Sequence, residues 1–443
     1  MTMTMTAAPV AVKERFGSMD VLRGVAVCGI LLMNIPLMGM MSDLTRPSLP
    51  ATPNIDWIAY SIQDVVFAGS MRGMFTLLFG AGMLIMLRRA DEPGGENAVW
   101  AYMTRCFALI LLGVVNFAIF MWPGEILFNY GVTGLGLFLF RKAPPRLLLT
   151  AAAASLVVLT LVLAIPSIDR AAALRDAPAA AAAKAEGKTL TDDQKAALKM
   201  QERGSKAIRP PADKLEKERV QRTRFPGVLV WSTKFWAEFN LGKIGLFFLL
   251  ESLGFMLVGM FLFQKGVLTG QKSLRFYGAL AVGGYGLGLA IRGVQAACAW
   301  TTGFELNPEQ MLWGSFLYEV GRLPMTIGLL GLVMTLYQTG ALGKLADALK
   351  AIGRMALTNY VGQSVITAIL FYAFGLLGKF GFAQLMGIAA LIWIAQGIFS
   401  VLWLRVFEMG PLEWLLRMLT YGQKNPIPRV APATAVPVAA PAE

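Results

Sequence analysis

The sequence of 443 residues contains no histidine and only three cysteines. Histidine is the side chain whose unperturbed pKa lies nearest to neutral pH, so proton transfer at pH 7 must use another group. Cys28, Cys106 and Cys298 stand singly within apolar segments, with no C-x-x-C spacing. This pattern indicates neither a disulfide framework nor a thiolate metal site, so we expect no metal and three small packing residues.

Charged residues are also scarce. Only 15% of the chain is charged, 56% is hydrophobic, and the mean hydropathy is +0.58. Such a composition is typical of a protein with many bilayer spans. The net charge of +13 arises from basic residues in the short loops between apolar runs, which places them against anionic lipid headgroups and not against nucleic acid. We therefore predict an all-α polytopic membrane protein.

About 20 apolar residues are needed to cross roughly 30 Å of hydrocarbon. Basic residues such as Lys13, Arg88, Arg141, Lys265 and Lys344 fall in alternate loops, so the positive-inside rule predicts a multi-pass membrane protein with both termini cytoplasmic. The expected count is ten spans, give or take one, because the fourth is short and residues 57–70 either extend the second or lie in the interface. The ten stretches are 20–41, 73–90, 102–121, 126–141, 146–166, 244–264, 273–298, 313–338, 355–377 and 382–407.

One long connection divides the chain. We expect an N-terminal membrane region (1–166), a charged, Ala-rich extracytoplasmic connection (167–243), a C-terminal membrane region (244–422) and a disordered Pro/Ala tail (423–443). The composition of 167–243 favours an exposed helix or a hairpin of helices. Glycines in "GAG" at 80–82 and "GGYGLGLAIRG" at 283–293 lie inside spans and predict close helix packing, not a nucleotide-binding loop.

Ionisable residues within spans are costly and are functional-site hypotheses by default. Asp20 and Arg23 are three residues apart and share a helix face with Asn34. An ion pair at the headgroup level plus an amide between helices is the structural alternative. Glu319 and Arg322 have the same spacing, and we interpret them as a structural pair. The other ionisable residues at or within spans are Arg72, Glu125, Glu251 and Arg292.

Several stretches resemble the DUF418 (YeiB-like) family of bacterial inner-membrane proteins. They are "SMDVLRGVAVCGILLMNI" (18–35), "MFTLLFGAGM" (74–83), "IGRMALTNYVGQSVI" (352–366) and "GPLEWLLRMLTYG" (410–422). The family is grouped with transmembrane acyltransferases that move an acyl group from cytoplasmic acyl-CoA to an acceptor on the far side. The matching polar positions are Asp20, Arg23, Asn34, Asn359, Gln363, Glu413 and Arg417.

The chain departs from the family in its third span, where the family has His and Asp and this sequence has Asn116 and Glu125. An amide cannot titrate, but Asn116 can donate a hydrogen bond to a developing oxyanion, an interaction worth about 3 to 4 kcal/mol. If the resemblance extends to catalysis, a carboxylate must act as the base, with Glu125 or Asp20 raised towards pH 7 by desolvation. We expect Asp20, Asn34, Asn116 and Glu125 to be catalytic and to converge on one chamber.

Acyl-CoA is thus the expected donor substrate, and an envelope carbohydrate or lipid the acceptor. Arg23, Arg72, Arg354, Asn359 and Gln363 are the expected substrate-binding residues, although positive-inside topology explains the cytoplasmic arginines equally well. Glu413 and Arg417, with Glu319 and Arg322, are expected to be structural. Two alternatives stay open: a transporter or flippase whose path the same charges line, and a catalytically inactive binding member. A homodimer is compatible with the sequence.

Overall fold

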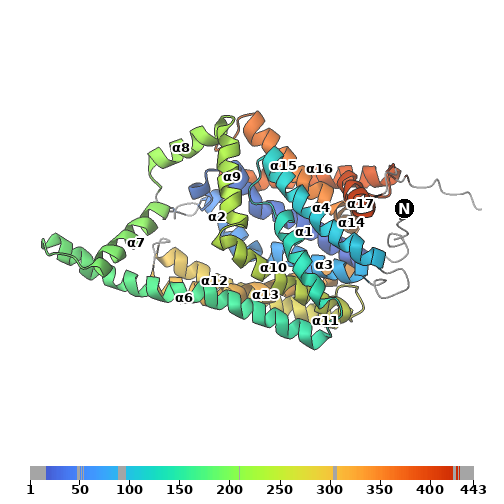
Figure 1. The fold of residues 1–443 in the computed structure, drawn as a ribbon, viewed down its shortest axis with the longest axis horizontal. Helices are drawn as coiled ribbons and strands as arrows, with labels where there is room; N and C mark the ends of the chain where they lie inside the picture. The colour runs from blue at the N-terminus through green and yellow to red at the C-terminus, as the bar shows by residue number, and fades with distance from the viewer. Residues whose placement is uncertain are drawn as a thin grey trace, which may run out of the picture.

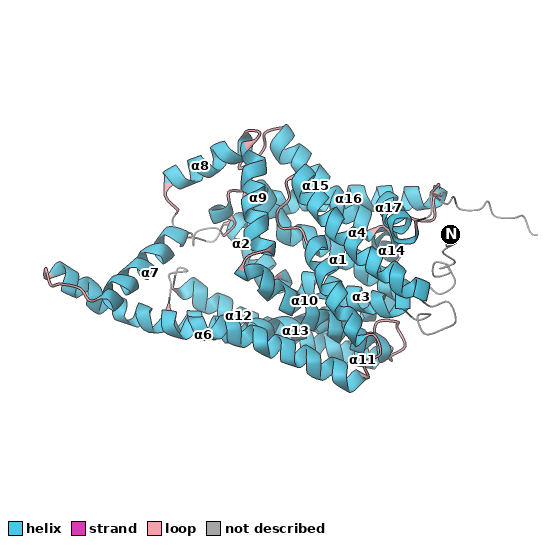
Figure 2. Cartoon of the chain, in the orientation of Figure 1, coloured by secondary structure: helices cyan, strands magenta, loops and turns pink. Residues whose placement is uncertain are grey.

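The computed structural model describes residues 16–46, 50, 52, 54–87, 96–208, 210–302, 307–422, 426–427 and 429. Within this part of the chain every regular element is a helix, apart from an isolated bridge between Phe407 and Arg429 (Figure 2). The predicted all-α class is confirmed. Lys13, Arg88 and nearly all of the predicted disordered tail lie outside the described residues.

Eight helical stretches in the described part are long and apolar enough to cross a membrane. They are Gly17–Gly39, Ile55–Leu87, Asn97–Phe120, Pro145–Ala185, Lys243–Gln264, Leu274–Thr301, Pro308–Gln338 and Phe382–Val406. They cover eight of the ten predicted spans. The second begins at Ile55 because α2 (Ile55–Ile62) and the π-helix Gln63–Phe67 precede α3 (Ser70–Leu87), so residues 57–70 extend it.

The other two predicted spans are helical but do not qualify by length and composition. Residues 126–141 form α5 (Leu127–Leu137) and a 3-10 turn, and residues 355–377 form α15 (Ala356–Ala368) followed by a π-helix, Ile369–Ala373. The first is a short apolar helix. The second carries the polar Asn359 and Gln363 near its middle, which lowers its hydropathy.

The remaining helices complete a bundle in which α1 packs on α14, α10 on α3 and α6 (Pro145–Ala185), and α13 on α12 (Figure 1). Side-chain caps begin α11 and α13: at α13, Asn307 accepts hydrogen bonds from the N–H groups of Glu309 and Gln310. These helices are α1 (Gly17–Gly39), α4 (Glu96–Phe120), α10 (Lys243–Gln264), α11 (Leu274–Leu280), α12 (Gly286–Thr301), α13 (Pro308–Gln338), α14 (Lys344–Arg354), α16 (Phe382–Val406) and α17 (Pro411–Tyr421).

The long connection between the two membrane regions is largely helical. It comprises the second half of the 41-residue α6 (Pro145–Ala185), then α7 (Asp192–Ile208), α8 (Ala212–Thr223) and α9 (Gly227–Asn240). In Figure 1, α6 runs past the bundle, and α7 and α8 lie beyond it before α9 returns. We call this end of the bundle the loop end, and the opposite end, where α1 begins and Arg23 and Arg354 lie, the basic end.

Arg222 anchors the connection to the bundle. Its side chain is fully buried and donates hydrogen bonds to the carbonyl oxygens of Leu37, Met38 and Met40 at the end of α1. Its guanidinium also lies 4.0 Å from the ring centroid of Trp231. Because a basic side chain satisfies the free carbonyls at a helix C-terminus, this contact holds α8 and α9 against α1.

Two glycines allow α3 and α10 to touch. A Cβ on Gly80 would stand 2.0 Å from the Met256 carbonyl oxygen, and one on Gly259 would stand 1.9 Å from that of Leu77. Only residues without a side chain permit backbones this close. The contact confirms the packing role predicted for Gly80 and brings α3 and α10 together around their polar side chains.

Candidate functional site

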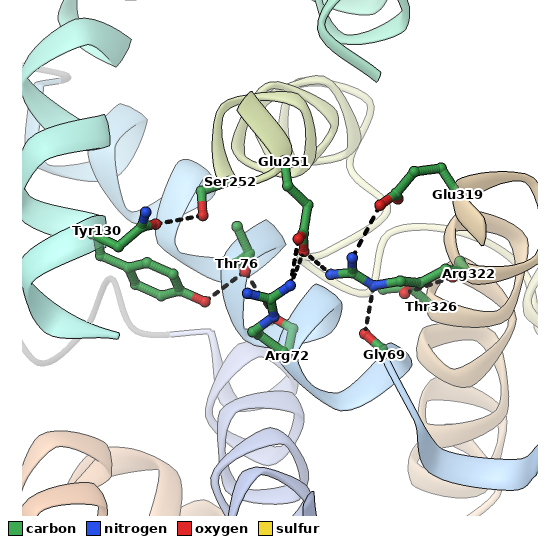
Figure 3. A network of polar contacts seen from close by, with 10 residues as sticks. Gly69, Arg72, Thr76, Tyr130, Glu251, Ser252, Glu319, Arg322 and Thr326 are labelled. Carbon is green, nitrogen blue, oxygen red and sulfur yellow. Dashed lines mark hydrogen bonds and ion pairs between the residues drawn. The ribbon is translucent and has the colours of Figure 1, made fainter. Parts of the chain in front are cut away.

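Four charged side chains from three helices form a buried network in the bundle (Figure 3). Glu251 of α10 is hydrogen-bonded and ion-paired to Arg72 of α3 and to Arg322 of α13. Arg322 also donates to the carboxylate of Glu319, one turn earlier on α13, with an N···O distance of 3.2 Å. Two carboxylates face two guanidinium groups, so the network is balanced in charge when all four are ionised.

Most of the hydrogen-bonding groups in the network have partners among the surrounding residues. Arg322 donates to the Gly69 carbonyl oxygen at 3.1 Å and lies 4.8 Å from the ring centroid of Phe255. Arg72 lies 4.3 Å from the ring centroid of Phe248. One atom is the exception: Oε2 of Glu319 is buried and has no hydrogen-bond partner among the described residues.

The sequence predicted part of this network. The Glu319–Arg322 pair forms as expected, but it is joined to two other helices and is not isolated. The sequence indicates that Glu251 is an intramembrane carboxylate but does not assign it to a site, because its partners lie 179 and 71 residues away in the chain. A carboxylate in the middle of an apolar span, with no basic residue within one turn of it, is the signal that could identify it.

A cavity of about 370 Å³ lies towards the basic end. Arg23, Arg105 and Arg354 line it there, and Arg23 and Arg105 are close enough for their charges to interact. Its remaining walls are mainly apolar and aromatic and come from α3, α4, α5, α15 and α17. Along α3 it extends from Met86 to Phe75, about 16 Å at 1.5 Å per residue. Its inner residues include Leu127, Tyr130 and Tyr360.

A second cavity, of about 560 Å³, lies towards the loop end between α6, α10 and α13. Its outer lining includes Arg46, Arg170, Asn307 and Gln310, and its inner lining includes Glu251 and Glu319 of the buried network. Apolar residues from α6 and α10 complete the walls: Leu159, Leu163, Ile244, Phe247 and Phe248.

A short series of hydrogen-bonded polar side chains lies between the two cavities and links them (Figure 3). The hydroxyl of Tyr130, which lines the basic-end cavity, lies 2.5 Å from Oγ1 of Thr76. The Thr76 hydroxyl also bonds to the backbone carbonyl of Arg72 at 2.8 Å. Arg72 in turn binds Glu251, which lines the loop-end cavity. We call Tyr130, Thr76, Arg72 and Glu251 the septum.

Glu125 lies in the connection between α4 and α5, outside the spanning helices, and its side chain is fully buried. Its Oε2 accepts hydrogen bonds from the N–H groups of Leu127 (2.7 Å) and Phe128 (3.1 Å), so it caps α5. Its Oε1 accepts a hydrogen bond from Nε1 of Trp236 on α9 at 3.1 Å. Burial raises the pKa of the Glu125 carboxyl from 4.5 to about 7, although these three donors oppose the rise.

The four residues expected to share one chamber do not all lie together. Asn116 is fully buried, and neither polar atom of its side chain has a hydrogen-bond partner among the described residues. Oε2 of Glu125 packs on Gly113, one turn from Asn116, so these two residues share the end of α4. Asp20 instead pairs with Arg23 at 3.1 Å at the basic end. The half-buried Asn34 lies about 21 Å further along α1.

None of these four residues is among those that line the two cavities, whereas Arg23, Arg354 and Glu413 line the basic-end cavity. Glu413 accepts hydrogen bonds from the N–H groups of Leu357 (2.7 Å) and Thr358 (3.2 Å), which makes it a cap for α15. Arg354 donates to the Glu408 carbonyl oxygen at 2.9 Å. Arg417 is half-buried on α17.

The two amides expected to bind substrate make contacts between helices. Asn359 donates to the Ser400 hydroxyl at 2.9 Å, and Gln363 donates to the Val27 carbonyl oxygen and to the Gln396 side chain, each at 3.2 Å. Each amide residue is only 2% exposed. These bonds attach α15 to α1 and α16.

Comparison with known proteins agrees with the sequence motifs. The model of the family "Protein of unknown function (DUF418)" matches residues 262–423. The chain is 31% identical to "Uncharacterized protein YeiB" of Escherichia coli (strain K12), over 93% of this chain and 98% of that protein. It is 28% identical to "Uncharacterized protein YxaH" of Bacillus subtilis (strain 168), over 95% and 97% of the two chains. No solved structure matches it. The chain belongs to the DUF418 (YeiB-like) family of membrane proteins.

Proposed function

We propose that the protein is an acyl-CoA-dependent transmembrane acyltransferase of the bacterial inner membrane, with its basic end and both termini in the cytoplasm. One observation carries the proposal: two cavities with different linings approach the same polar septum from opposite ends of the bundle. Different linings fit two different substrates better than one substrate that passes through both cavities.

The basic-end cavity suits the donor. Arg23, Arg105 and Arg354 would contact the phosphates of coenzyme A, because guanidinium groups bind phosphate oxygens through paired N–H donors. The narrow apolar and aromatic passage beyond them suits the pantetheine arm and the acyl group. In this arrangement the thioester reaches Tyr130 and Tyr360 at the inner end of the cavity.

In the reaction, a hydroxyl oxygen of the acceptor bonds to the acyl carbon while the C–S bond of the thioester breaks. The hydroxyl proton passes to a base, and coenzyme A leaves as a thiolate that takes up a proton to become the free thiol. Glu125 lines neither cavity, but it is the base we propose, because its pKa of about 7 matches the task and it accepts a hydrogen bond from the N–H of Leu127, which lines the inner end of the donor cavity. Its neighbour Ile126 donates its N–H to the hydroxyl of Tyr360, which lines the donor cavity.

The donor site is tested by binding of radiolabelled acyl-CoA to the purified full-length protein. Arg105→Gln should weaken binding about tenfold, the equivalent of about 1.4 kcal/mol. Arg275→Gln is the matched control, because Arg275 is an exposed arginine at the same end that does not line the cavity. Equal affinities of the two variants would argue against this cavity as the donor site.

The chemistry is tested by acyl-CoA-dependent labelling of an envelope fraction. Labelling should disappear in Glu125→Gln while acyl-CoA binding persists. Labelling that survives would remove Glu125 as the base. If acyl-CoA neither binds nor labels the envelope, the transferase proposal falls.

A transporter or flippase is the second candidate, because cavities on both sides of a charged septum are also what alternating access requires. Substrate flux through proteoliposomes with no acyl donor present would favour it over the transferase.

A further inference from the structure

The loop-end cavity contains a buried carboxylate oxygen that the protein itself leaves unpaired. Glu319 lines the cavity, is 5% exposed, and uses only its Oε1 to accept a hydrogen bond from Arg322. Oε2 has no hydrogen-bond partner among the described residues. A buried acceptor without a donor costs about 1 to 3 kcal/mol, so a ligand that supplies an O–H or N–H group there would recover that energy.

The charges around the cavity favour an anionic ligand. The four charges of the inner network cancel. The outer lining adds two guanidinium groups, those of Arg46 and the exposed Arg170, so the lining at the mouth of the cavity carries positive charge. A phosphate group would be held there, with the side-chain amide of Asn307 as a further polar partner.

The cavity walls are fixed by bonds between helices. The hydroxyls of Ser167 on α6 and Ser315 on α13 lie 2.7 Å apart, and both residues line the cavity. Further out, Arg175 of α6 pairs with Glu309 of α13 at 2.6 Å. The site is therefore preorganised, which lowers the entropy lost on binding.

We infer that the loop-end cavity is a binding site for a phosphate-bearing, hydroxyl-rich group, and that Glu319 accepts a hydrogen bond from one of its hydroxyls. This inference rests on the proposed function, in which the cavity holds the acyl acceptor. The same chemistry occurs in a lipid headgroup such as phosphoglycerol and in a free sugar or glycerol phosphate. The apolar residues of α6 and α10 in its walls favour the lipid, whose hydrocarbon they would contact.

The test is protection of a cysteine placed in the cavity. Gly314 lines it, and a Cβ added there would meet no atom within 4 Å, so Gly314→Cys introduces a thiol without a clash. Full-length protein, with Cys28, Cys106 and Cys298 replaced by alanine, is placed in nanodiscs and alkylated with a membrane-impermeant maleimide. Ser205→Cys on the exposed α7 is the matched control for reagent access.

Alkylation of Gly314→Cys should be roughly fivefold slower in nanodiscs that contain phosphatidylglycerol than in pure phosphatidylcholine, as expected when bound ligand exceeds its Kd about fourfold. Ser205→Cys should react equally in both. Phosphatidic acid, which carries the phosphate without the glycerol hydroxyls, should protect less. If soluble glycerol phosphate protects the cysteine in phosphatidylcholine nanodiscs and the anionic lipids do not, the binding site is supported and its ligand is a free phosphate, not a lipid headgroup.

Two variants connect protection to the proposed contacts. Arg170→Gln, at an exposed position that carries little risk to folding, should remove most of the protection. Glu319→Gln should make phosphatidylglycerol no better than phosphatidic acid. Alkylation that neither phosphatidylglycerol nor glycerol phosphate slows would overturn the inference, as would full protection in Arg170→Gln.

This assay contains no acyl-CoA, so a negative result bears on the phosphate-binding site and not on the acyltransferase proposal. Protection without any acyl-CoA binding at the basic end would leave the site standing and remove the transferase. Acyl-CoA binding without protection would remove only the acceptor site.

Discussion

The two buried carboxylates Glu251 and Glu125 are stabilised in opposite ways. Glu251 is 6% exposed and faces two guanidinium groups, whereas Glu125 is fully buried and receives only neutral N–H donors from the backbone and an indole. Full opposite charges offset the cost of burying Glu251, so its removal leaves two buried guanidinium groups with one fewer carboxylate. Dipoles offset the burial of Glu125 only partly, so its protonation state responds to pH near neutrality.

The largest expected effect is at Glu251. Glu251→Gln should destabilise the protein by about 3 to 5 kcal/mol, because it leaves Arg72 and Arg322 buried with one fewer carboxylate. Thermal unfolding in detergent micelles measures the loss. Glu309→Gln breaks an exposed pair with Arg175 and should cost less than about 1 kcal/mol. Equal losses from the two substitutions would show that the network does not hold the helices together.

A smaller effect is expected at Glu125, as a dependence of stability on pH. Its folded pKa of about 7 lies above its ordinary 4.5, so between these values the folded state holds a proton that the unfolded chain releases. Stability should therefore fall by roughly 3 kcal/mol as pH rises from 4.5 to 7, and this contribution should level off above that range. Denaturation midpoints measured from pH 4 to 8 test the slope. Glu125→Gln should flatten it, and an unchanged slope in that variant would assign the dependence to another group.

The sequence predicted features set by local spacing more successfully than features set by distant contacts. The Asp20–Arg23 and Glu319–Arg322 pairs form as expected, since residues three apart on a helix are neighbours in any fold. The pairing of Arg72 with Glu251 depends on how α3 packs on α10, which hydropathy alone does not specify.

The same limit applies to the outer connection and to the span count. Trp236 lies in the segment expected to be an exposed helix or hairpin, yet its indole N–H reaches Glu125, 111 residues away in the chain. No motif marks that contact. Among the described residues, fewer helices than the ten predicted qualify as membrane spans by length and composition. The window 355–377 is one of the two that do not qualify, because it contains amides that bond to neighbouring helices.

The indole N–H of Trp236 is expected to contribute less to stability than the Glu125 carboxylate that it contacts. Trp236→Phe keeps a ring to stack on Phe117, whose centroid lies 4.3 Å away, but removes the hydrogen bond to Glu125. The loss should be about 2 kcal/mol at pH 8, where the carboxylate is charged, and smaller at pH 5, where it is protonated. Trp313→Phe, at an exposed position, is the control. A loss in Trp236→Phe that does not vary with pH would mean that the indole acts through packing alone.

The smallest effect is expected at the hydroxyl link of the septum. Thr76→Val preserves shape but removes the hydroxyl between Tyr130 and the Arg72 backbone, and should cost about 1 kcal/mol, because the Tyr130 hydroxyl borders a cavity where water can replace its partner. Thr76→Ser keeps the hydroxyl and loses only a methyl group. If Thr76→Val is destabilised no more than Thr76→Ser in thermal unfolding, the Thr76–Tyr130 bond contributes nothing to stability. The charged pairs would then hold the septum on their own.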